Sequence, residues 1–185
     1  MRKLIYSMTV SLDGYIADPD GAIDWTAPDE ELLRFHNQRV RETGPQLYGR
    51  HLYETMLVWE TIEQDPNTSD VMLEFAGIYK ERPKLVFSRQ LDSVIGNATL
   101  ETGDPGPVVE RLKQDPGKDL AVGGAGLASS LMKLDLIDEY LLFIAPVILG
   151  GGTPYFADLD HRLNLELVET RTFASRVIYA HYRRV

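Results

Sequence analysis

The sequence contains no cysteine among its 185 residues. This absence excludes disulfide bonds, thiolate nucleophiles and cysteine-ligated zinc sites. Basic residues are also in deficit, because 19 Lys and Arg side chains stand against 28 Asp and Glu side chains and leave a formal net charge of −9. Nucleic acids and anionic membranes attract positively charged surfaces, so we expect neither as a partner. A local basic pocket for a phosphorylated ligand is compatible with this balance.

Long apolar runs are missing as well. The longest, Tyr140–Leu149, is too short to cross a hydrocarbon layer of about 30 Å. The stretch Leu4–Leu12 is interrupted by hydroxyl side chains and ends at Asp13, a pattern more typical of a first strand than of a signal peptide. We therefore expect a soluble, cytoplasmic protein.

What is present is the composition of an ordinary globular domain, with 44% hydrophobic and 25% charged residues. The length suits a single domain over residues 1–185, and no internal repeat or low-complexity linker divides it. Strand and helix patterns alternate along most of the chain, and two strands at its end, 163–170 and 174–182, resemble an antiparallel hairpin. This order predicts an α/β fold with a mixed, mainly parallel sheet, an antiparallel C-terminal hairpin and helices on both faces.

The earlier elements follow from hydrophobic periodicity and from Gly and Pro punctuation. The expected strands are 3–10, 46–49, 84–87, 120–122 and 139–149. The expected helices are 28–41, 50–57, 69–81, 107–114 and 125–134. Pro28 is expected in the first turn of its helix, with Thr26 and Asp29 as a capping box.

A strand–glycine–helix unit over residues 120–134 is the strongest local signal. Gly123, Gly124 and Gly126 lie where the strand passes into the helix, and glycine there permits a tight turn and close approach of a ligand to the backbone. The helix start adds free N–H groups and a positive dipole end, which together bind phosphate. Taken alone, the pattern fits a tight turn with nothing bound equally well.

Two further strand ends carry cations. Arg50 and His51 follow Gly49 at a helix start, where a cation is unfavourable beside the positive end of the helix dipole and requires an anionic partner. Ser88 and Arg89 follow the strand 84–87 and combine a hydroxyl donor with a guanidinium. Each pair alone is more often a solvated surface turn. Three such turns in one α/β sheet are more informative, because ligands bind beyond the carboxyl ends of its strands.

The motifs also occur in a recognisable order. They are Ser11–Ala17 (SLDGYIA), Asp24-Trp25 before Pro28, Gly49–Glu54 (GRHLYE), Val86–Arg89 (VFSR), Val122–Gly126 (VGGAG) and Ala145–Gly152 (APVILGGG). This set, which extends over nearly the whole chain, resembles the dihydrofolate reductase-like superfamily. The branch it resembles contains the C-terminal reductase domain of the bifunctional deaminase-reductase of riboflavin biosynthesis.

The resemblance implies a three-layer dihydrofolate reductase-like fold and an NADPH-dependent reductase of a small heterocyclic substrate. The reaction it suggests first is the 5-amino-6-(5-phosphoribosylamino)uracil reductase step, with dihydrofolate reduction as the alternative. A non-catalytic NADP(H)-binding protein is an alternative of another class. The zinc deaminase half of the bifunctional enzyme is absent, because its site needs cysteine ligands. We also expect a homodimer, since related domains tend to dimerise and the apolar strand 139–149 and the tail hairpin could present a self-complementary surface.

The resemblance also assigns individual residues. Thr9 and Ile16 correspond to positions that flank the nicotinamide, and Asp24 and Trp25 to positions beside the substrate. The other implied cofactor contacts are Gly49, Arg50, His51 and Leu52 at the phosphates, Ser88 and Arg89 at the 2′-phosphate, and Gly123, Gly124, Ala125, Gly126 and Leu127 at the pyrophosphate.

The proton donor remains open at this point. Counting from Trp25 favours Glu30 or Glu31, whereas helical phase favours Asp29, and all three could instead be first-turn acids that complement the helix dipole. We take Glu30 and Asp29 as the catalytic candidates. Asp13 is a further acid near the expected site. The histidines lack partners at metal-ligand spacing, so we expect no metal.

Overall fold

The computed structural model describes residues 1–26 and 28–185. Its strands are β1 (Leu4–Ser11), β2 (Tyr15–Ala17), β3 (Gln46–Gly49), β4 (Lys84–Phe87), β5 (Ala98–Glu101), β6 (Leu120–Gly123), β7 (Glu139–Ala145), β8 (Thr153–Pro154), β9 (Leu165–Thr172) and β10 (Ile178–Arg184). Its α-helices are α1 (Glu30–Glu42), α2 (Arg50–Met56), α3 (Asp70–Glu81), α4 (Pro105–Gln114) and α5 (Ala125–Lys133). Short 3-10 turns cover Asp24–Thr26, Leu57–Glu60 and Ile62–Gln64.

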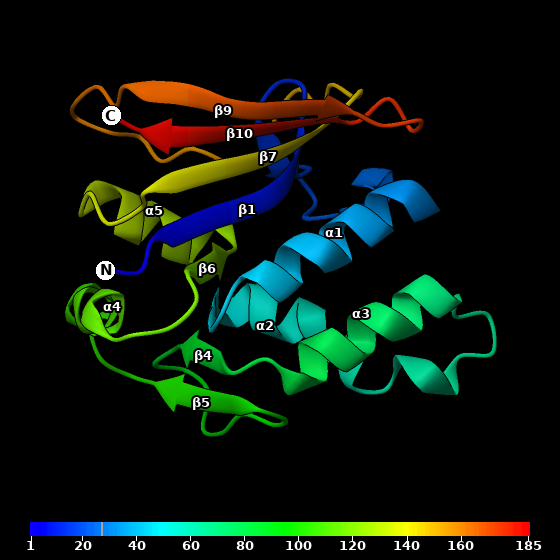
Figure 1. Cartoon of the computed structure of the whole chain (residues 1–185), viewed down its shortest axis with the longest axis horizontal. Helices are drawn as coiled ribbons and strands as arrows, with labels where there is room; N and C mark the ends of the chain where they lie inside the picture. The colour runs from blue at the N-terminus through cyan, green and yellow to red at the C-terminus, as the bar shows by residue number, and fades with distance from the viewer. Residues whose placement is uncertain (27) are drawn as a thin grey trace.

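The centre of the molecule is an eight-stranded sheet in the order β5-β4-β3-β6-β1-β7-β10-β9 (Figure 1). Every pair from β5 to β7 is parallel, and the pairs β7–β10 and β10–β9 are antiparallel. The predicted mainly parallel sheet with an antiparallel C-terminal hairpin is therefore confirmed.

Helices cover both faces of this sheet, as expected, because β1 is buried on both sides. Leu4 and Tyr6 pack with Leu131 of α5 in one hydrophobic core. Ile5, from the same strand, packs in a second core with Leu32 of α1. Successive strand residues point to opposite faces, so one strand supports two helical layers.

The boundaries differ from the predictions at two informative places. Helix α1 begins at Glu30 rather than Pro28, because Asp29 is its N-cap and accepts a hydrogen bond from the Leu32 N–H at 2.8 Å. The expected capping box is wrong, since the Thr26 hydroxyl donates to the carbonyl of Ile23 at 2.7 Å. Strand β7 ends at Ala145 and not at Leu149, because the next residue, Pro146, has no N–H to donate to a neighbouring strand.

The strand expected to contribute to a dimer surface lies inside the sheet. Strand β7 pairs with β1 on one side and β10 on the other, and nearly all its side chains are buried. The edge strand is β9, where Leu167 and Val168 are about half exposed. The homodimer stays a prediction, with β9 in place of β7 as the available surface. We expect light scattering at micromolar concentration to give twice the chain mass, and a monomer mass would reject the dimer.

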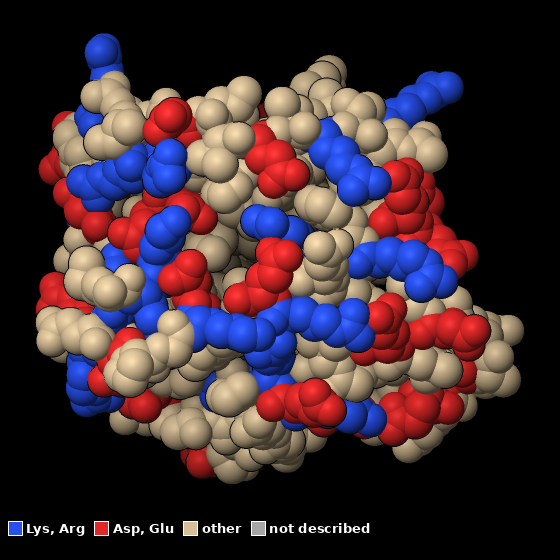
Figure 2. All heavy atoms as spheres, viewed as in Figure 1, with Lys and Arg blue, Asp and Glu red and all other residues tan. Residues whose placement is uncertain are grey.

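Charge is distributed evenly over the face that Figure 2 shows, where acidic and basic side chains alternate without a large patch of one sign. Within residues 1–26 and 28–185, no helix combines the length and apolarity needed to cross a membrane.

Candidate functional site

Three adjacent cavities lie on one side of the sheet. Two of them lie at the carboxyl ends of the parallel strands, and the third extends along the sheet face, where Ile5, Ala121 and Leu141 line it. The inner cavity, beneath α1, has a volume of about 260 Å³, the central groove about 900 Å³ and the outer pocket about 420 Å³. The inner cavity and the central groove share Met8, Ile16, Ile23, Leu52 and Thr55 in their walls. The central groove and the outer pocket share Arg50, His51 and Phe87. Each cavity is therefore adjacent to the next, with side chains that belong to both walls.

Strand order explains why turns far apart in the sequence meet here. Strand β3 pairs in parallel with β4 on one side and β6 on the other. The register places Gly49 opposite Phe87, and Tyr48 opposite Gly123. The turns that follow these strands consequently lie next to one another, which the sequence predicted only as a common edge of the sheet.

The glycine turn after β6 fits a phosphate group. Gly124 is the N-cap of α5 with φ of +83°, a left-handed conformation that favours glycine. Gly126 lines the central groove in the first turn of α5, and a Cβ atom placed on it would have no other atom within 4 Å. The amides at the start of α5 therefore border open space where an anion can approach closely.

The two arginines of the site differ in their partners. Arg50 Nη1 lies 3.2 Å from Glu54 Oε1. The Glu54 carboxylate, on the same helix, is therefore one anionic partner for the cation at the start of α2. Arg89 lines the outer pocket and makes no ion pair with any residue that the structure describes; its Nε–H donates to the Thr102 carbonyl at 3.4 Å. The Ser88 oxygen accepts the Gln90 and Leu91 amides, which leaves its O–H able to donate. The outer pocket thus offers a guanidinium and a hydroxyl to an anion.

Asp13 holds two loops together and is not a free acid. Its carboxylate accepts hydrogen bonds from the amides of Leu149 at 3.1 Å and Gly150 at 2.8 Å, and from the Ser11 hydroxyl at 2.7 Å. The Ser11 bond and the two amides lower the pKa of Asp13. Ser11 also accepts the Tyr15 amide at 2.9 Å, which connects the network to β2 beside the central groove. These contacts keep Asp13 ionised as a positioning group.

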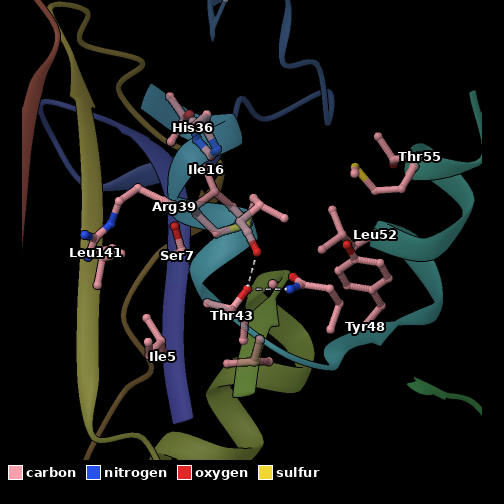
Figure 3. A pocket seen from close by; sticks show the side chains of 18 of the residues that line it. Ile5, Ser7, Ile16, His36, Arg39, Thr43, Tyr48, Leu52, Thr55 and Leu141 are labelled. Atoms are coloured by element: carbon pink, nitrogen blue, oxygen red, sulfur yellow. Dashed lines mark hydrogen bonds between the residues drawn. The ribbon is translucent and has the colours of Figure 1, made fainter. Parts of the chain in front are cut away.

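The inner cavity is mainly apolar (Figure 3). Arg39 is the charged side chain in its described wall, where no carboxylate occurs. His36 also lines it, stacked on Phe143 with ring centroids 4.3 Å apart, and burial lowers the pKa of His36 to about 4. Its imidazole is therefore neutral at pH 7.

The carboxylates at the start of α1 have partners outside the cavities. Asp29 caps the helix, and Glu30 Oε1 accepts two hydrogen bonds from Arg34, at 2.6 and 3.0 Å. Glu31 bonds Arg171 at 2.7 Å and the Ala174 amide, contacts that lower the pKa of Glu31. Within the described walls of the three cavities, none of these acids occurs. Their role as proton donor stays a prediction, and their contacts favour helix capping and surface ion pairing.

Single-turnover hydride transfer can distinguish a catalytic acid at the start of α1 from a residue that only caps the helix or forms a surface ion pair. We expect Glu30→Gln to retain the wild-type rate within about twofold, because exposed ion pairs contribute little. Asp29→Asn should behave alike, since Asn also caps helices. A loss of about 10²–10⁴-fold in either variant, the scale of general acid catalysis, would instead restore that residue as the acid.

The structure places all of the predicted cofactor residues in the walls of the three cavities. Ile16, Gly49, Arg50, His51, Leu52, Gly124, Ala125, Gly126 and Leu127 line the central groove, Ser88 and Arg89 line the outer pocket, and Thr9 and Gly123 line the inner cavity.

The predicted substrate contacts Asp24 and Trp25 lie outside the cavities, and their assignment stays a prediction. Asp24 is exposed and Trp25 donates its indole N–H to the Ala22 carbonyl at 3.2 Å, and neither lines a cavity in the part of the chain that the structure describes. Their neighbours Ile23 and Thr26 line the inner cavity, because residues 24–26 form a 3-10 turn.

Sequence reasoning missed the α1 contribution to the cavity and the second loop of the outer pocket. Arg39 lies on α1, whose pattern indicated only an amphipathic helix. Thr102 and Gly103 border the outer pocket after the unpredicted strand β5, and the turn sequence Gly103–Pro105 was the available signal. No group of three or more His, Cys, Asp or Glu side chains arranged for a metal occurs among the described residues.

Comparisons with known proteins place the chain among relatives of matching length. The family model described as the RibD C-terminal domain matches residues 2–179. The uncharacterized protein YyaP from Bacillus subtilis (strain 168) is 35% identical over 98% of this chain and 94% of its own length. YwjB from the same strain is 31% identical over 99% of this chain and 98% of its own.

Solved structures share the fold at lower identity. A Shewanella sp. PV-4 protein named for riboflavin biosynthesis has a TM-score of 0.74 and 22% identity, over 100% of this chain and 99% of that chain. A diaminohydroxyphosphoribosylaminopyrimidine deaminase/5-amino-6-(5-phosphoribosylamino)uracil reductase from Thermotoga maritima has a TM-score of 0.69 and 15% identity, over 100% of this chain and 57% of that chain. A pyrimidine reductase-like protein from Corynebacterium diphtheriae has a TM-score of 0.66 and 13% identity, over 100% of this chain and 92% of that chain.

Proposed function

The chain belongs to the RibD C-terminal domain family, and from this premise we propose that it is a cytoplasmic, NADPH-dependent reductase of a small heterocyclic compound. The observation that carries the proposal is the adjacency of two cavities of different character. An extended groove, bordered by turns that suit phosphate groups, lies next to a small apolar cavity, and both include Met8, Ile16 and Leu52 in their walls. This arrangement suits a long dinucleotide and a small second ligand that meet at one point.

The residues present fit NADPH. The amides at the start of α5 would hold the pyrophosphate, and Arg89 with Ser88 would hold the 2′-phosphate. Ile16 and Thr9 would lie beside the nicotinamide, which places it at the junction with the inner cavity. NADPH when bound supplies a hydride. The chain's own part is to orient the two ligands and to surround the reacting atoms with a mainly apolar wall, whose described part contains no carboxylate.

Two other functions are less well supported. Dihydrofolate reduction would use an acid beside the substrate, and the described wall of the inner cavity contains none. A protein that binds NADP(H) without turnover would need no second cavity, yet the inner cavity adjoins the central groove and shares wall residues with it.

The experiment that tests the cofactor assignment compares NADPH with NADH in Arg89→Ala. We expect the variant to lose about 10–100-fold in NADPH affinity and to keep its NADH affinity, because a charge-assisted hydrogen bond contributes roughly 1.5–3 kcal/mol. Isothermal titration calorimetry measures both constants.

Arg34→Ala is the matched control, since Arg34 pairs with Glu30 on the surface and should leave both affinities unchanged. Equal losses for the two cofactors in Arg89→Ala contradict the 2′-phosphate assignment. Failure of the wild-type protein to bind either cofactor contradicts the proposed function itself.

A further inference from the structure

The inner cavity differs from the rest of the site in charge and size. The outer pocket and the central groove contain Arg50 and Arg89, whereas Arg39 is the charged group in the described wall of the inner cavity. Its volume of about 260 Å³ lies below the range of about 300–1,000 Å³ that is usual for drug-sized ligands. The room beneath α1 therefore suits a compound of one or two rings.

The charge of Arg39 already has a counterion. Its Nη1 lies 2.9 Å from Glu42 Oε2, at the last residue of α1. His36, the other basic group in the wall, is neutral because it is buried against Phe143. The formal charge around the cavity is consequently close to zero, and an anionic ligand would have to compete with the Glu42 carboxylate for one guanidinium.

One donor of this guanidinium is left without an acceptor. Arg39 Nε is buried and has no hydrogen-bond partner in the described structure. Because almost none of the Nε surface is accessible even to a water-sized atom, a ligand oxygen in the cavity does not reach it. Ser7 on β1 lies at the same end of the cavity in Figure 3, and its hydroxyl has no hydrogen bond among the described residues. The Ser7 hydroxyl can therefore donate to a neutral carbonyl oxygen.

Several of the remaining polar side chains of the wall are already hydrogen-bonded within the chain, whereas the hydroxyls of Thr9 and Tyr48 have no hydrogen bond among the described residues. Thr43 donates to the Val40 carbonyl at 2.9 Å and accepts from the Gln46 amide at 2.9 Å. Thr55 donates to the His51 carbonyl at 2.9 Å. A sugar phosphate, which needs several donors and more than one cation, would find few of them here.

Resting on the proposed function, we propose that the substrate of the inner cavity is a small, planar, uncharged ring compound with a ring carbonyl and without a phosphate or carboxylate group. The phosphates of the complete reaction complex then belong to the cofactor alone. The carbonyl oxygen accepts from the Ser7 hydroxyl, and the ring lies among the apolar side chains of the cavity.

The test measures ligand binding to the NADP⁺-saturated protein by calorimetry, so that it does not depend on turnover. The probes are pteridine-2,4-dione, its 6-carboxylate, and 5-amino-6-(5-phosphoribosylamino)uracil. We expect the uncharged ring to bind at least about tenfold more tightly than either anion. One uncompensated charge on the ligand is expected to weaken the binding free energy by roughly 1.4 kcal/mol, which is a factor of ten in affinity.

Glu42→Gln provides an internal check on the electrostatic argument. Glu42 is exposed and does not line the described cavity, so the variant should fold normally. It removes the carboxylate that neutralises Arg39 and leaves the positive charge of the guanidinium without a counterion. We expect its preference for the uncharged ring over the 6-carboxylate to fall by about tenfold.

Tighter binding of either anion, no binding of the uncharged ring, or an unchanged preference in Glu42→Gln overturns the inference. NADPH affinity is measured in the same preparations. Normal NADPH binding with any of these results rejects only the substrate class, whereas absent NADPH binding rejects the proposed function.

Discussion

Replacing Gly126 by Asp should reduce NADPH affinity by about 10²-fold or more, because a carboxylate within about 5 Å of the pyrophosphate costs roughly 1–3 kcal/mol in addition to its steric effect. A side chain at this position meets no other atom of the chain within 4 Å, so it extends into the central groove. The fold should tolerate the change, since Asp in the first turn of α5 complements the helix dipole.

Gly77→Asp is the matched control for this variant. Gly77 also lies in a helix, α3, and is exposed, and a Cβ atom placed on it would likewise have no other atom within 4 Å. Within the described residues, however, it lines none of the three cavities. We expect Gly77→Asp to bind NADPH like the wild type in calorimetry. If Gly126→Asp also retains wild-type affinity while its thermal unfolding is unchanged, the cofactor does not use the α5 turn.

The second large effect concerns stability and lies at the opposite ends of the same strands. We expect Glu139→Gln to lower the free energy of unfolding by roughly 3 kcal/mol at pH 7. Glu139 is nearly buried, with its two oxygens 2.6 Å from Lys3 Nζ and 2.9 Å from His181 Nε2. The hydrogen bond from His181, aided by Lys3, lowers the pKa of Glu139 from its ordinary 4.5 to about 2.

The pH dependence follows from the direction of this shift. Because the carboxyl group is more acidic in the folded state, its contribution is complete above pH 4.5, where the unfolded chain is also ionised. The contribution is lost as the pH falls from 4.5 towards 2. Urea unfolding between pH 7 and pH 3 should therefore show a steeper loss of stability in the wild type than in Glu139→Gln.

Glu166→Gln is the control on a neighbouring strand. Glu166 pairs with Arg183 at 3.1 Å, but both side chains are about half exposed. An exposed pair contributes about 0–1 kcal/mol, so this variant should remain close to the wild type at every pH. Equal stability of Glu139→Gln and Glu166→Gln would mean that the buried cluster contributes no more than a surface pair.

Local sequence signals predicted the parts of the site that are built within one strand–turn–helix unit. The glycines after β6, the Gly49-Arg50-His51 turn and the Ser88-Arg89 turn all line the cavities. In each turn, the residues that let the backbone bend lie within a few positions of the strand or helix that they join, so a short stretch of sequence contains the whole signal. The common edge of the parallel strands was predictable for the same reason, because alternating strands and helices favour a parallel sheet.

The proton-donor candidates show where this reasoning stops. Counting from Trp25 and helical phase placed Glu30 and Asp29 near the substrate, but neither measure includes the neighbours that compete for a carboxylate. Arg34 pairs with Glu30 one turn along the helix, and Asp29 caps the helix itself. The orientation of an exposed side chain depends on such small energies, which a spacing pattern does not contain.

The sequence by itself determined the mixed α/β architecture, the absence of cysteine chemistry and the three turns that line the cavities, because these depend on composition and on contacts between residues close in the chain. Only the tertiary structure decided the inner cavity and the buried Glu139 cluster. Arg39 of α1 and Ser7 of β1 line the same cavity, and Glu139 of β7 is hydrogen-bonded to His181 of β10. These pairs are set by the order and register of strands, and strand order arises from the packing of the whole sheet and not from any local segment.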